Sequence, residues 1–444
     1  MFHLRREGVP DPPAPFGAGP RLPIPRGPLH PTDGAPARHG PSGAHRQVSD
    51  LAVIIETRVF AGSERHTVEL IKHLVEAGWK VALVEAGGDF VASRLPKEHP
   101  NLRVVRTHLP LADPSRGSDR AWRLVLRQVP ARRVLLVKTW YFAADLGSLR
   151  AIRRTFEVVY HIEHSLPPER AHGSERRHLG VLPGLGLRRY RDAWRRWRMS
   201  RMVDHVLAVS GAGSRALAEH AFLRPEQIST CPNGVDARCW TRDTAGGREF
   251  RLRHGIAPSS YLFGVVARLE RLKAIDLAIR AVALLKADCA EPLELCVVGD
   301  GPCREELKGL AAHLGIADRV HFTGTLADVK SAYSAIDTYL CTSTTESWPL
   351  VLNEAMACGC RLVAAAVGGV PEVAADPICG TLLDSREPTE WARVLRQHVK
   401  TPLAERREIS QRIQAYVARE HSLQARFAYL ASVLEGPPGL LRRA

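Results

Sequence analysis

The stretch from residue 51 to residue 84, LAVIIETRVFAGSERHTVELIKHLVEAGWKVALV, decides the fold class. Its first five residues form an apolar run rich in branched side chains, which is typical of a buried strand. Gly62 and Ser63 follow, and apolar residues then recur at helical spacing until Gly78. A second apolar run occupies 81–84. A strand, a glycine loop, a helix and a strand in this order predict a βαβ unit of a parallel sheet.

The same alternation of apolar runs and helical patterns continues along the chain. Further strands are expected at 104–105, 134–137, 158–160, 206–209, 263–266, 293–298, 320–322, 338–340 and 362–364. The polar stretch from Trp240 to Phe250 has two glycines and is typical of a linker. Two successive βα series therefore predict an α/β chain of two doubly wound domains, with a ligand in the cleft between them.

The predicted domain boundaries follow from this alternation and from composition. Residues 1–50 hold eleven of the 31 prolines and seven glycines without apolar periodicity. Residues 1–49 are therefore expected to be a disordered leader, or a stretch added by a start codon that has been placed too far upstream. We expect the first domain at 50–245, the second at 246–418, and a final helical segment at 419–444.

The charge balance favours acidic partners without choosing among them. The formal net charge is +15, which suits phosphates, nucleotides, nucleic acid or an anionic membrane. No apolar run approaches the roughly 20 residues of a membrane span, and the N-terminus lacks the apolar core of a secretory signal. These features predict a cytoplasmic protein. No helix-turn-helix, zinc-finger or RNP-like pattern supports nucleic-acid binding.

Nine cysteines occur, all from Cys231 onward, and none form a Cys-x-x-Cys pair. A structural zinc site usually needs four convergent ligands with short paired spacings. The pattern therefore favours free thiols in a reducing compartment and no metal site.

The segment from Glu346 to Glu354, ESWPLVLNE, carries the most chemistry. Ser347 and Pro349 are good signals for a helix start, which would put Glu346 before the helix and Glu354 in its second turn. The free N–H groups at such a helix start suit phosphate, and the carboxylates suit the hydroxyls of ribose or a sugar. By spacing alone, two solvated helix glutamates are the commoner explanation.

Three further features could complete an anion site. Arg268 and Lys273 follow the first strand of the second series, and their charges match a diphosphate, although a basic surface loop is the simpler explanation. The sequence contains no Asp-x-Asp pair, which would be the sign of a site with a bridging metal ion. Gly62 follows the first strand of the chain, and residues 368–372, GGVPE, form a second glycine loop after a strand of the other series.

Two segments of the first series remain open to two interpretations. His164 comes at the end of an expected strand, where side chains often face a ligand, but a lone histidine is often structural. Residues 188–201 hold seven arginines and one acid, with Tyr190, Trp194 and Trp197 on one helical face. Such a helix either lies on an anionic bilayer or packs its aromatics on the sheet.

Taken together, these residues resemble family 4 of the retaining glycosyltransferases. The second-domain motifs are the more specific: Arg268 with Lys273, residues 299–302 (GDGP), the block 346–359 and residues 368–372. The first-domain matches are weaker: Gly62 with Glu64, His164, residues 209–210 and residues 232–236. The resemblance covers roughly residues 50–430. Ala61, where the family usually has glycine, and Trp348, where phenylalanine is commoner, depart from it.

The resemblance implies the GT-B fold and a role for each matching residue. Arg268 and Lys273 would hold the diphosphate of a UDP- or GDP-sugar, and Glu346 would contact the transferred sugar. Glu354 would bind the ribose hydroxyls. The remaining implied residues are His164 at the reaction centre and Gly62, Leu350 and Val351 in the nucleotide-sugar site. Family members work without a metal, and their final helix, here Leu423 to Val433, often crosses back to the first domain.

The sequence thus predicts a metal-independent, retaining hexosyltransferase that uses no cofactor. It would move a sugar from a nucleoside diphosphate to a glycan or lipid-linked acceptor, with peripheral contact at the cytoplasmic face of an anionic membrane. Two alternatives remain: a nucleotide-sugar 2-epimerase on the same fold, and a non-catalytic regulator that binds nucleotide sugar.

Overall fold

The computed structural model describes residues 49–57, 62–111, 118–137, 146–166, 193–287 and 291–436. The expected leader, apart from Ser49, lies outside these residues, as do Ala61 and Tyr190. Residues from Gln47 onward form one compact unit. All the contacts below lie within it.

The first sheet has seven parallel strands in the order β3-β2-β1-β4-β5-β6-β7. The strands are β1 (Ser49–Glu56), β2 (Val81–Ala86), β3 (Leu102–Thr107), β4 (Ala131–Val137), β5 (Val158–Glu163), β6 (His205–Ala208) and β7 (Ile228–Thr230). The connecting elements are α1 (Gly62–Glu76), η1 (Ala92–Arg94), α2 (Ser118–Leu126), α4 (Leu146–Thr155), α6 (Gly211–His220) and η2 (Pro225–Gln227).

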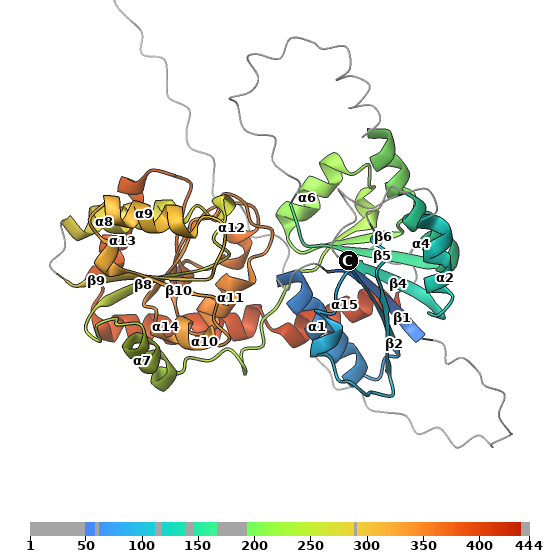
Figure 1. The fold of residues 1–444 in the computed structure, drawn as a ribbon, viewed down its shortest axis with the longest axis horizontal. Coiled ribbons are helices and arrows are strands. Elements are labelled where there is room, and N and C mark those ends of the chain that lie inside the picture. Colours follow the sequence, from blue (N-terminus) through green and yellow to red (C-terminus); the bar gives the residue numbers. More distant parts are fainter. Residues whose placement is uncertain are drawn as a thin grey trace, which may run out of the picture. The chain divides into compact units, whose positions relative to one another are not determined.

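Alternate residues of β1 explain why helices cover both faces of this sheet. Side chains along a strand point to opposite faces in turn, and both sets are apolar here. Leu51, Val53 and Ile55 pack with α1, whereas Ala52 and Ile54 pack with α2 and α4. Figure 1 shows α1 on one side of the sheet and α2 and α4 on the other.

The second sheet has six parallel strands in the order β10-β9-β8-β11-β12-β13. The strands are β8 (Tyr261–Val266), β9 (Leu293–Val298), β10 (Val320–Gly324), β11 (Thr338–Cys341), β12 (Arg361–Ala365) and β13 (Gly380–Leu383). The helices are α7 (Thr244–Arg253), η3 (Arg271–Lys273), α8 (Ile275–Ala287), α9 (Arg304–His313), η4 (Ala317–Arg319), α10 (Lys330–Ala335), α11 (Leu350–Ala357), α12 (Val370–Val373), η5 (Pro377–Cys379), α13 (Pro388–Lys400) and α14 (Leu403–Glu420). In Figure 1, α8, α9 and α13 cover one face, and α7, α10 and α14 cover the other.

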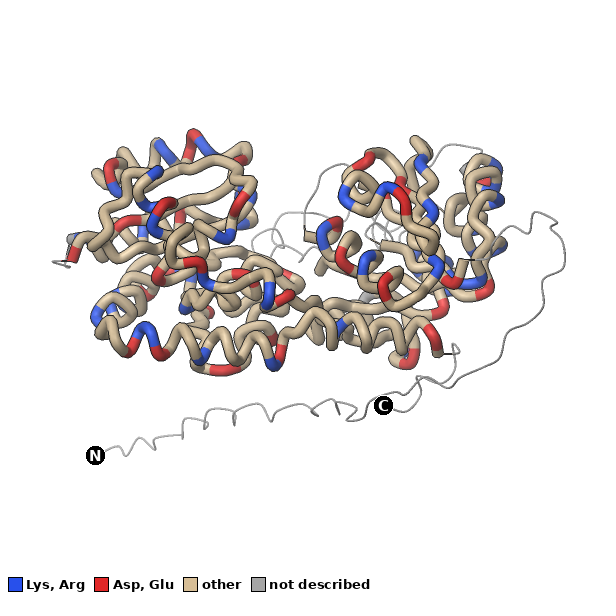
Figure 2. The backbone as a smooth tube through the Cα atoms, turned by 90° about the horizontal axis from the view of Figure 1, so that it is seen from below, with Lys and Arg blue, Asp and Glu red and all other residues tan. Residues whose placement is uncertain are grey.

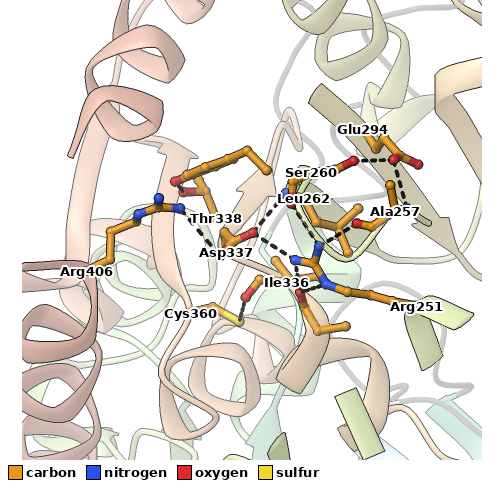
Figure 3. Close-up of polar contacts among 12 residues, drawn as sticks. Arg251, Ala257, Ser260, Leu262, Glu294, Ile336, Asp337, Thr338, Cys360 and Arg406 are labelled. Atoms are coloured by element: carbon orange, nitrogen blue, oxygen red, sulfur yellow. Dashed lines mark hydrogen bonds and ion pairs between the residues drawn. The ribbon is translucent and has the colours of Figure 1, made fainter. Parts of the chain in front are cut away.

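The expected strands all form, and the prediction of two doubly wound parallel sheets is confirmed. The short edge strands β7 and β13 were not expected, because three or four residues show no periodicity. The prediction of a polar linker at 240–250 is wrong from Thr244 onward, where α7 begins. Asp243 accepts hydrogen bonds from the N–H groups of Ala245 and Gly246 and so starts this helix. Arg251 on α7 then donates to Asp337 at 2.9 Å (Figure 3).

The last helix, α15 (Leu423–Glu435), lies against α1 of the first sheet (Figure 1). Phe427 is buried there, and its ring lies 5.3 Å from that of His66. The guanidinium of Arg133 donates to the carbonyl of Glu435 at 3.0 Å. At the start of α15, the N–H of Leu423 donates to the carbonyl of Val235 at 3.1 Å. The chain therefore passes between the two sheets twice, and the two crossing segments are hydrogen-bonded to each other.

The basic helix of the first half exposes its tryptophans. Residues 193–200 are helical, and Trp194 and Trp197 are 44% and 43% exposed. Arg198 lies over Trp194 and Arg201 over Trp197, each at 5.0 Å from the ring centroid. The interpretation that these aromatics pack on the sheet is therefore wrong for both tryptophans. Elsewhere, Lys and Arg are interspersed with Asp and Glu along the helices (Figure 2).

No helix within the described ranges is long and apolar enough to cross a bilayer.

Candidate functional site

The candidate site lies where the order of the second sheet reverses, between β8 and β11. In open parallel sheets, ligands bind beyond the carboxyl ends of the strands at such a reversal. The segment after β8 carries Arg268 and Lys273, the loop after β11 carries Glu346, and the segment after β12 carries residues 368–372, of which the last three begin α12. The topology therefore brings together three segments that are up to 104 residues apart in sequence.

Lys273 and Glu346 form an ion pair at the centre of this site. The Nζ atom of Lys273 lies 2.6 Å from Oε1 of Glu346. The hydroxyl of Ser343 donates to the same oxygen at 2.7 Å. The hydroxyl of Thr342 holds the loop below by donating to the carbonyl of Lys273 at 2.8 Å. Among the described contacts of Glu346, none involves Oε2, so this oxygen can accept a further hydrogen bond.

Arg268 does not join this pair. Its Nε lies 2.8 Å from Oε1 of Glu270, and its side chain is 59% exposed. An exposed ion pair of this kind contributes little to stability, so the guanidinium can turn to another anion at low cost.

Gly368 and Gly369 press directly against the backbone beside Glu346. The N–H of Gly369 donates to the carbonyl of Glu346 at 3.0 Å. A Cβ atom at Gly368 would come within 1.9 Å of the same carbonyl oxygen, and one at Gly369 within 1.9 Å of the Ser347 carbonyl oxygen. The glycine loop therefore fixes the position of Glu346, and no larger residue fits there without displacing it.

Helix α11 begins as the sequence predicts, but with a different cap. Pro349 is its N-cap, Leu350 and Val351 lie in its first turn, and Glu354 falls in its second. The prediction that Glu346 precedes the helix is confirmed. Ser347 does not cap it, because no side-chain hydrogen bond closes this end and the buried Ser347 hydroxyl has no partner.

Glu354 is buried and held from two sides. It is 4% exposed, and its Oε1 is ion-paired with Arg65 of α1. The hydroxyl of Tyr333 donates to Oε2 at 3.0 Å. Burial raises the pKa of Glu354, and the charge of Arg65 opposes this shift. The carboxylate thus meets a cation from the first half of the chain, which sequence reasoning missed because 289 residues separate the two.

The first-half candidates occupy separate positions around this helix. A Cβ atom at Gly62 would lie 3.7 Å from Cδ1 of Leu350, so the start of α1 adjoins the start of α11. His164 follows β5, and its ring lies 5.0 Å from that of His66. Burial, and then the neighbouring His164, lower the pKa of His66. His164 is therefore part of an aromatic cluster that also reaches α15.

A second contact between the halves also escaped sequence reasoning. Glu372 of α12, just after the glycine pair, accepts from the N–H of Gly211 at 2.6 Å and from that of Ala212 at 2.7 Å. These are the first two residues of α6, where the helix dipole favours an anion. The signal was present as a glutamate after a glycine pair, but its partner could not be read from sequence spacing.

No group of three or more potential metal ligands occurs among the described residues. Eight cysteines are described as free: Cys239 is exposed, Cys303 is intermediate, and the others are buried. Burial raises the pKa of the Cys296 thiol to about 12, so this thiol is protonated and a poor ligand.

Two family models match the chain, one on each half. The model "Glycosyltransferase Family 4" matches residues 60–238, and "Glycosyl transferases group 1" matches residues 248–416. A D-inositol 3-phosphate glycosyltransferase of Actinosynnema mirum is 38% identical over 214 residues, which are 45% of this chain and 50% of that protein. The corresponding protein of Salinispora arenicola is 39% identical over 208 residues, or 44% of this chain and 46% of its own length. The aligned part of the chain spans about half the length of these curated relatives.

Solved structures share the fold over most of the chain. The Anabaena protein Alr3699/HepE, in complex with UDP and glucose, aligns with a TM-score of 0.69 at 20% identity, covering 87% of this chain and 99% of that one. A glycosyltransferase from Rickettsia africae aligns with a TM-score of 0.71 at 15% identity, covering 88% and 98%. The two parallel sheets described above are therefore the GT-B arrangement of these enzymes.

Proposed function

The chain belongs to the group 1 and family 4 glycosyltransferases, and from this premise we propose that it transfers a sugar from a nucleoside diphosphate to an acceptor hydroxyl. The observation that carries the proposal is the ion pair between Lys273 and Glu346 at the reversal point of the second sheet. A cation and a carboxylate held together there match the two chemical parts of a nucleotide sugar, its diphosphate and its hydroxyls.

The cations would balance the charge of the departing diphosphate. Lys273 is 29% exposed, so its ammonium can reach a bound phosphate while it still contacts Glu346. Arg268 is exposed and, among the described residues, pairs with Glu270 alone, and its guanidinium suits a second phosphate oxygen. The free N–H groups of Leu350 and Val351 at the start of α11 add a partial positive charge.

The carboxylates would hold hydroxyl groups. Oε2 of Glu346 is available to a sugar hydroxyl, while Oε1 stays engaged with Lys273 and Ser343. Glu354, one further turn along, would take the ribose hydroxyls if Arg65 shares or releases its oxygen. Carboxylates repel phosphate, so this division of work places each charge beside a part of the substrate that it attracts.

We propose that transfer retains the anomeric configuration, as the family resemblance implies. The bond from the anomeric carbon to the phosphate oxygen breaks, and a bond to the acceptor oxygen forms on the same face. The acceptor proton passes to the departing phosphate, whose charge Lys273 and Arg268 stabilise. His164 would line the acceptor side of this centre from the end of β5.

The partners are proposed on the same basis. A UDP-sugar donor is supported by the Anabaena structure, which is a complex with UDP and glucose. A glycan or lipid-linked acceptor, reached at an anionic membrane surface, is supported by the exposed Trp194 and Trp197 beside four arginines at 195, 196, 198 and 201.

A transfer assay with a panel of UDP- and GDP-sugars tests the proposal. Lys273→Ala should lower turnover at least about a hundredfold, as expected for the loss of a group that stabilises transition-state charge. Lys308→Ala is the matched control, because Lys308 is an exposed lysine whose one ion pair within the described residues is with Glu305, also on α9. Equal turnover of wild type and Lys273→Ala would refute the assigned role. Conversion of the donor to an isomeric sugar without acceptor would instead indicate an epimerase.

A further inference from the structure

A second cavity lies at the opposite end of the second sheet from the candidate site. Its volume is about 460 Å³. It is lined by Tyr261 and Arg361, the first residues of β8 and β12, by Asp337 directly before β11, and by residues of α14. We call it the amino-end pocket. Strand β11 separates it from the loop that carries Glu346, so the two sites cannot share one small ligand.

The lining of the amino-end pocket is strongly basic. Four arginines face it: Arg242, Arg361, Arg406 and Arg407. Asp337 is the only acidic residue in the lining. Its Oδ2 atom is already bound by a guanidinium from outside the pocket, that of Arg251 at 2.9 Å. The lining therefore carries four cations and one carboxylate, and of the four only Arg406 lies within 4 Å of that carboxylate.

The contacts of Arg406 show that Asp337 neutralises the positive charge of the lining only in part. Its nearest carboxylate oxygen, Oδ1 of Asp337, lies 3.8 Å away, beyond normal hydrogen-bond distance. Arg251 and Arg406 approach Asp337 from opposite sides (Figure 3). The guanidinium of Arg406 also lies 5.0 Å from the centroid of the Tyr261 ring, which fixes its plane.

Two guanidinium nitrogens of the pocket are buried without a partner. The Nε atoms of Arg361 and Arg406 have no hydrogen-bond partner among the described residues, and neither is exposed to solvent. A buried donor left unsatisfied costs about 1–3 kcal/mol, more when it is charged. Arg242 makes one long contact, to the hydroxyl of Ser410 at 3.3 Å. Among the described residues, the terminal nitrogens of Arg361 make no hydrogen bond, so they can donate to a ligand in the cavity that Arg361 lines.

The neutral part of the lining does not offset this charge. His398 stands between two hydroxyls, 3.2 Å from Thr338 and 3.4 Å from Thr381. Burial, and then the charge of Arg361, lower the pKa of His398 to about 3, so its imidazole is neutral near pH 7. Even a neutral His398 leaves the pocket with an excess of positive charge, because no second carboxylate lines it.

We propose that the amino-end pocket binds a small phosphate-bearing anion. Guanidinium groups bind phosphate oxygens through paired hydrogen bonds, and both Arg361 and Arg406 line the cavity. The volume is in the range of pockets that hold small-molecule ligands. Arg242 belongs to the segment that joins the two sheets, and Arg406 belongs to α14, which runs into α15. A bound anion would tie these two crossing segments together, and so could regulate the enzyme from a site separate from its substrates.

Calorimetric titration of the full chain with inorganic pyrophosphate at constant ionic strength tests this proposal. The titration uses Lys273→Ala as the background, which weakens binding at the candidate site. Adding Arg361→Gln and Arg406→Gln should weaken pyrophosphate binding at least tenfold. Adding Arg393→Gln should not, because this exposed arginine of α13 lies outside the pocket lining and pairs with Glu390. Inorganic phosphate and glucose 6-phosphate, titrated in parallel, distinguish a free phosphate ligand from a phosphorylated sugar.

Three outcomes would overturn the proposal: no binding of any probe at millimolar concentration, equal binding in the double arginine variant, or equal loss in the Arg393→Gln control. Thermal unfolding of each variant checks that the fold persists. If the double variant does not fold, Arg242→Gln provides the same test, because Arg242 has a single hydroxyl contact to lose. Failure of this test leaves the proposed transfer activity unaffected, since Arg361 and Arg406 lie outside the candidate site.

Discussion

The glycine loop after β12 makes the sharpest test of how the site is built. Gly368→Ala and Gly369→Ala each add one methyl group. At both positions the new Cβ would come within 1.9 Å of a backbone carbonyl oxygen, that of Glu346 or that of Ser347. A backbone oxygen cannot rotate away as a side chain can. The loop or the segment before α11 must therefore move by more than 1 Å to reach an ordinary contact of about 3.4 Å.

The two substitutions differ in backbone strain, which gives an expected order. Gly368 has a φ of +52°, so alanine adds about 1–2 kcal/mol of left-handed strain. Gly369 has a φ of −86°, which alanine adopts freely. Overpacking costs about 1–3 kcal/mol at either position. We therefore expect a loss of about 2–5 kcal/mol for Gly368→Ala and of about 1–3 kcal/mol for Gly369→Ala.

Thermal unfolding followed by circular dichroism measures this order. One kcal/mol corresponds to about 2–4 °C for a domain of 150–250 residues, so Gly368→Ala should lower Tm by at least about 4 °C. Gly309→Ala is the control, because a Cβ at that helical glycine would meet no described atom within 4 Å apart from its own helix backbone and chain neighbours. It should raise Tm slightly, since alanine favours a helix by about 1 kcal/mol over glycine. Unchanged Tm in both loop variants would refute the packing described here.

Three further predictions concern charged groups. A double-mutant cycle of Lys273→Met and Glu346→Gln should give a coupling free energy of about 1–3 kcal/mol by thermal or urea unfolding, and additive effects would contradict the ion pair. Arg65→Ala should destabilise the chain by about 1–2 kcal/mol more than Glu354→Gln, because only Arg65→Ala leaves a buried carboxylate without its cation. The difference is kept small by the half-exposed position of Arg65. A larger loss for Glu354→Gln would contradict this prediction. Burial lowers the pKa of His398 to about 3 and those of two further histidines to about 4. The unfolded chain, with histidine pKa values near 6.5, therefore binds more protons, so stability should fall as the pH drops below about 6.5, by up to about 1.4 kcal/mol per pH unit and histidine. A flat dependence of Tm on pH between 6.5 and 4.5 would contradict that.

Most of the fold could be predicted from the sequence because its strands are buried on both faces. A parallel strand of this kind is a continuous apolar run, and each run from Leu51 onward marked a strand. The failures lie where burial is partial or local capping decides. Helix α7 looked like a linker because its sequence is polar with two glycines, and its formation depends on the Asp243 cap and on Arg251 reaching Asp337. Strand β13 is half-buried along its whole length and shows no apolar run.

The candidate site could be predicted only in part. Local signals placed Glu346 and Glu354 correctly around the helix start, because Pro349 marks that start in sequence. The partners of these carboxylates were not predictable in the same way. Arg65 and Tyr333 reach Glu354 through tertiary packing, and neither carries a motif of its own. The roles of His164, Arg268 and the other site residues in binding and catalysis stay predictions, for the assays above to test.

The same arrangement of strands explains why two anion sites can coexist on the second sheet. At the carboxyl ends of the strands, the glycine loop packs against backbone carbonyl oxygens. A lysine there pairs with one oxygen of a carboxylate, and the other oxygen can accept from a hydroxyl. At the amino ends, arginines outnumber carboxylates, and two of their nitrogens lack partners within the described chain. The first composition suits a substrate that carries both phosphates and hydroxyls, whereas the second suits the phosphate group of a ligand. Because α14 and the segment containing Arg242 both contact the second site, charge added there acts on the two segments that join the halves of the chain. Anion binding at the amino ends would therefore change the contacts between the carboxyl-end site and the residues Arg65 and Gly62, although no ligand atom reaches these residues.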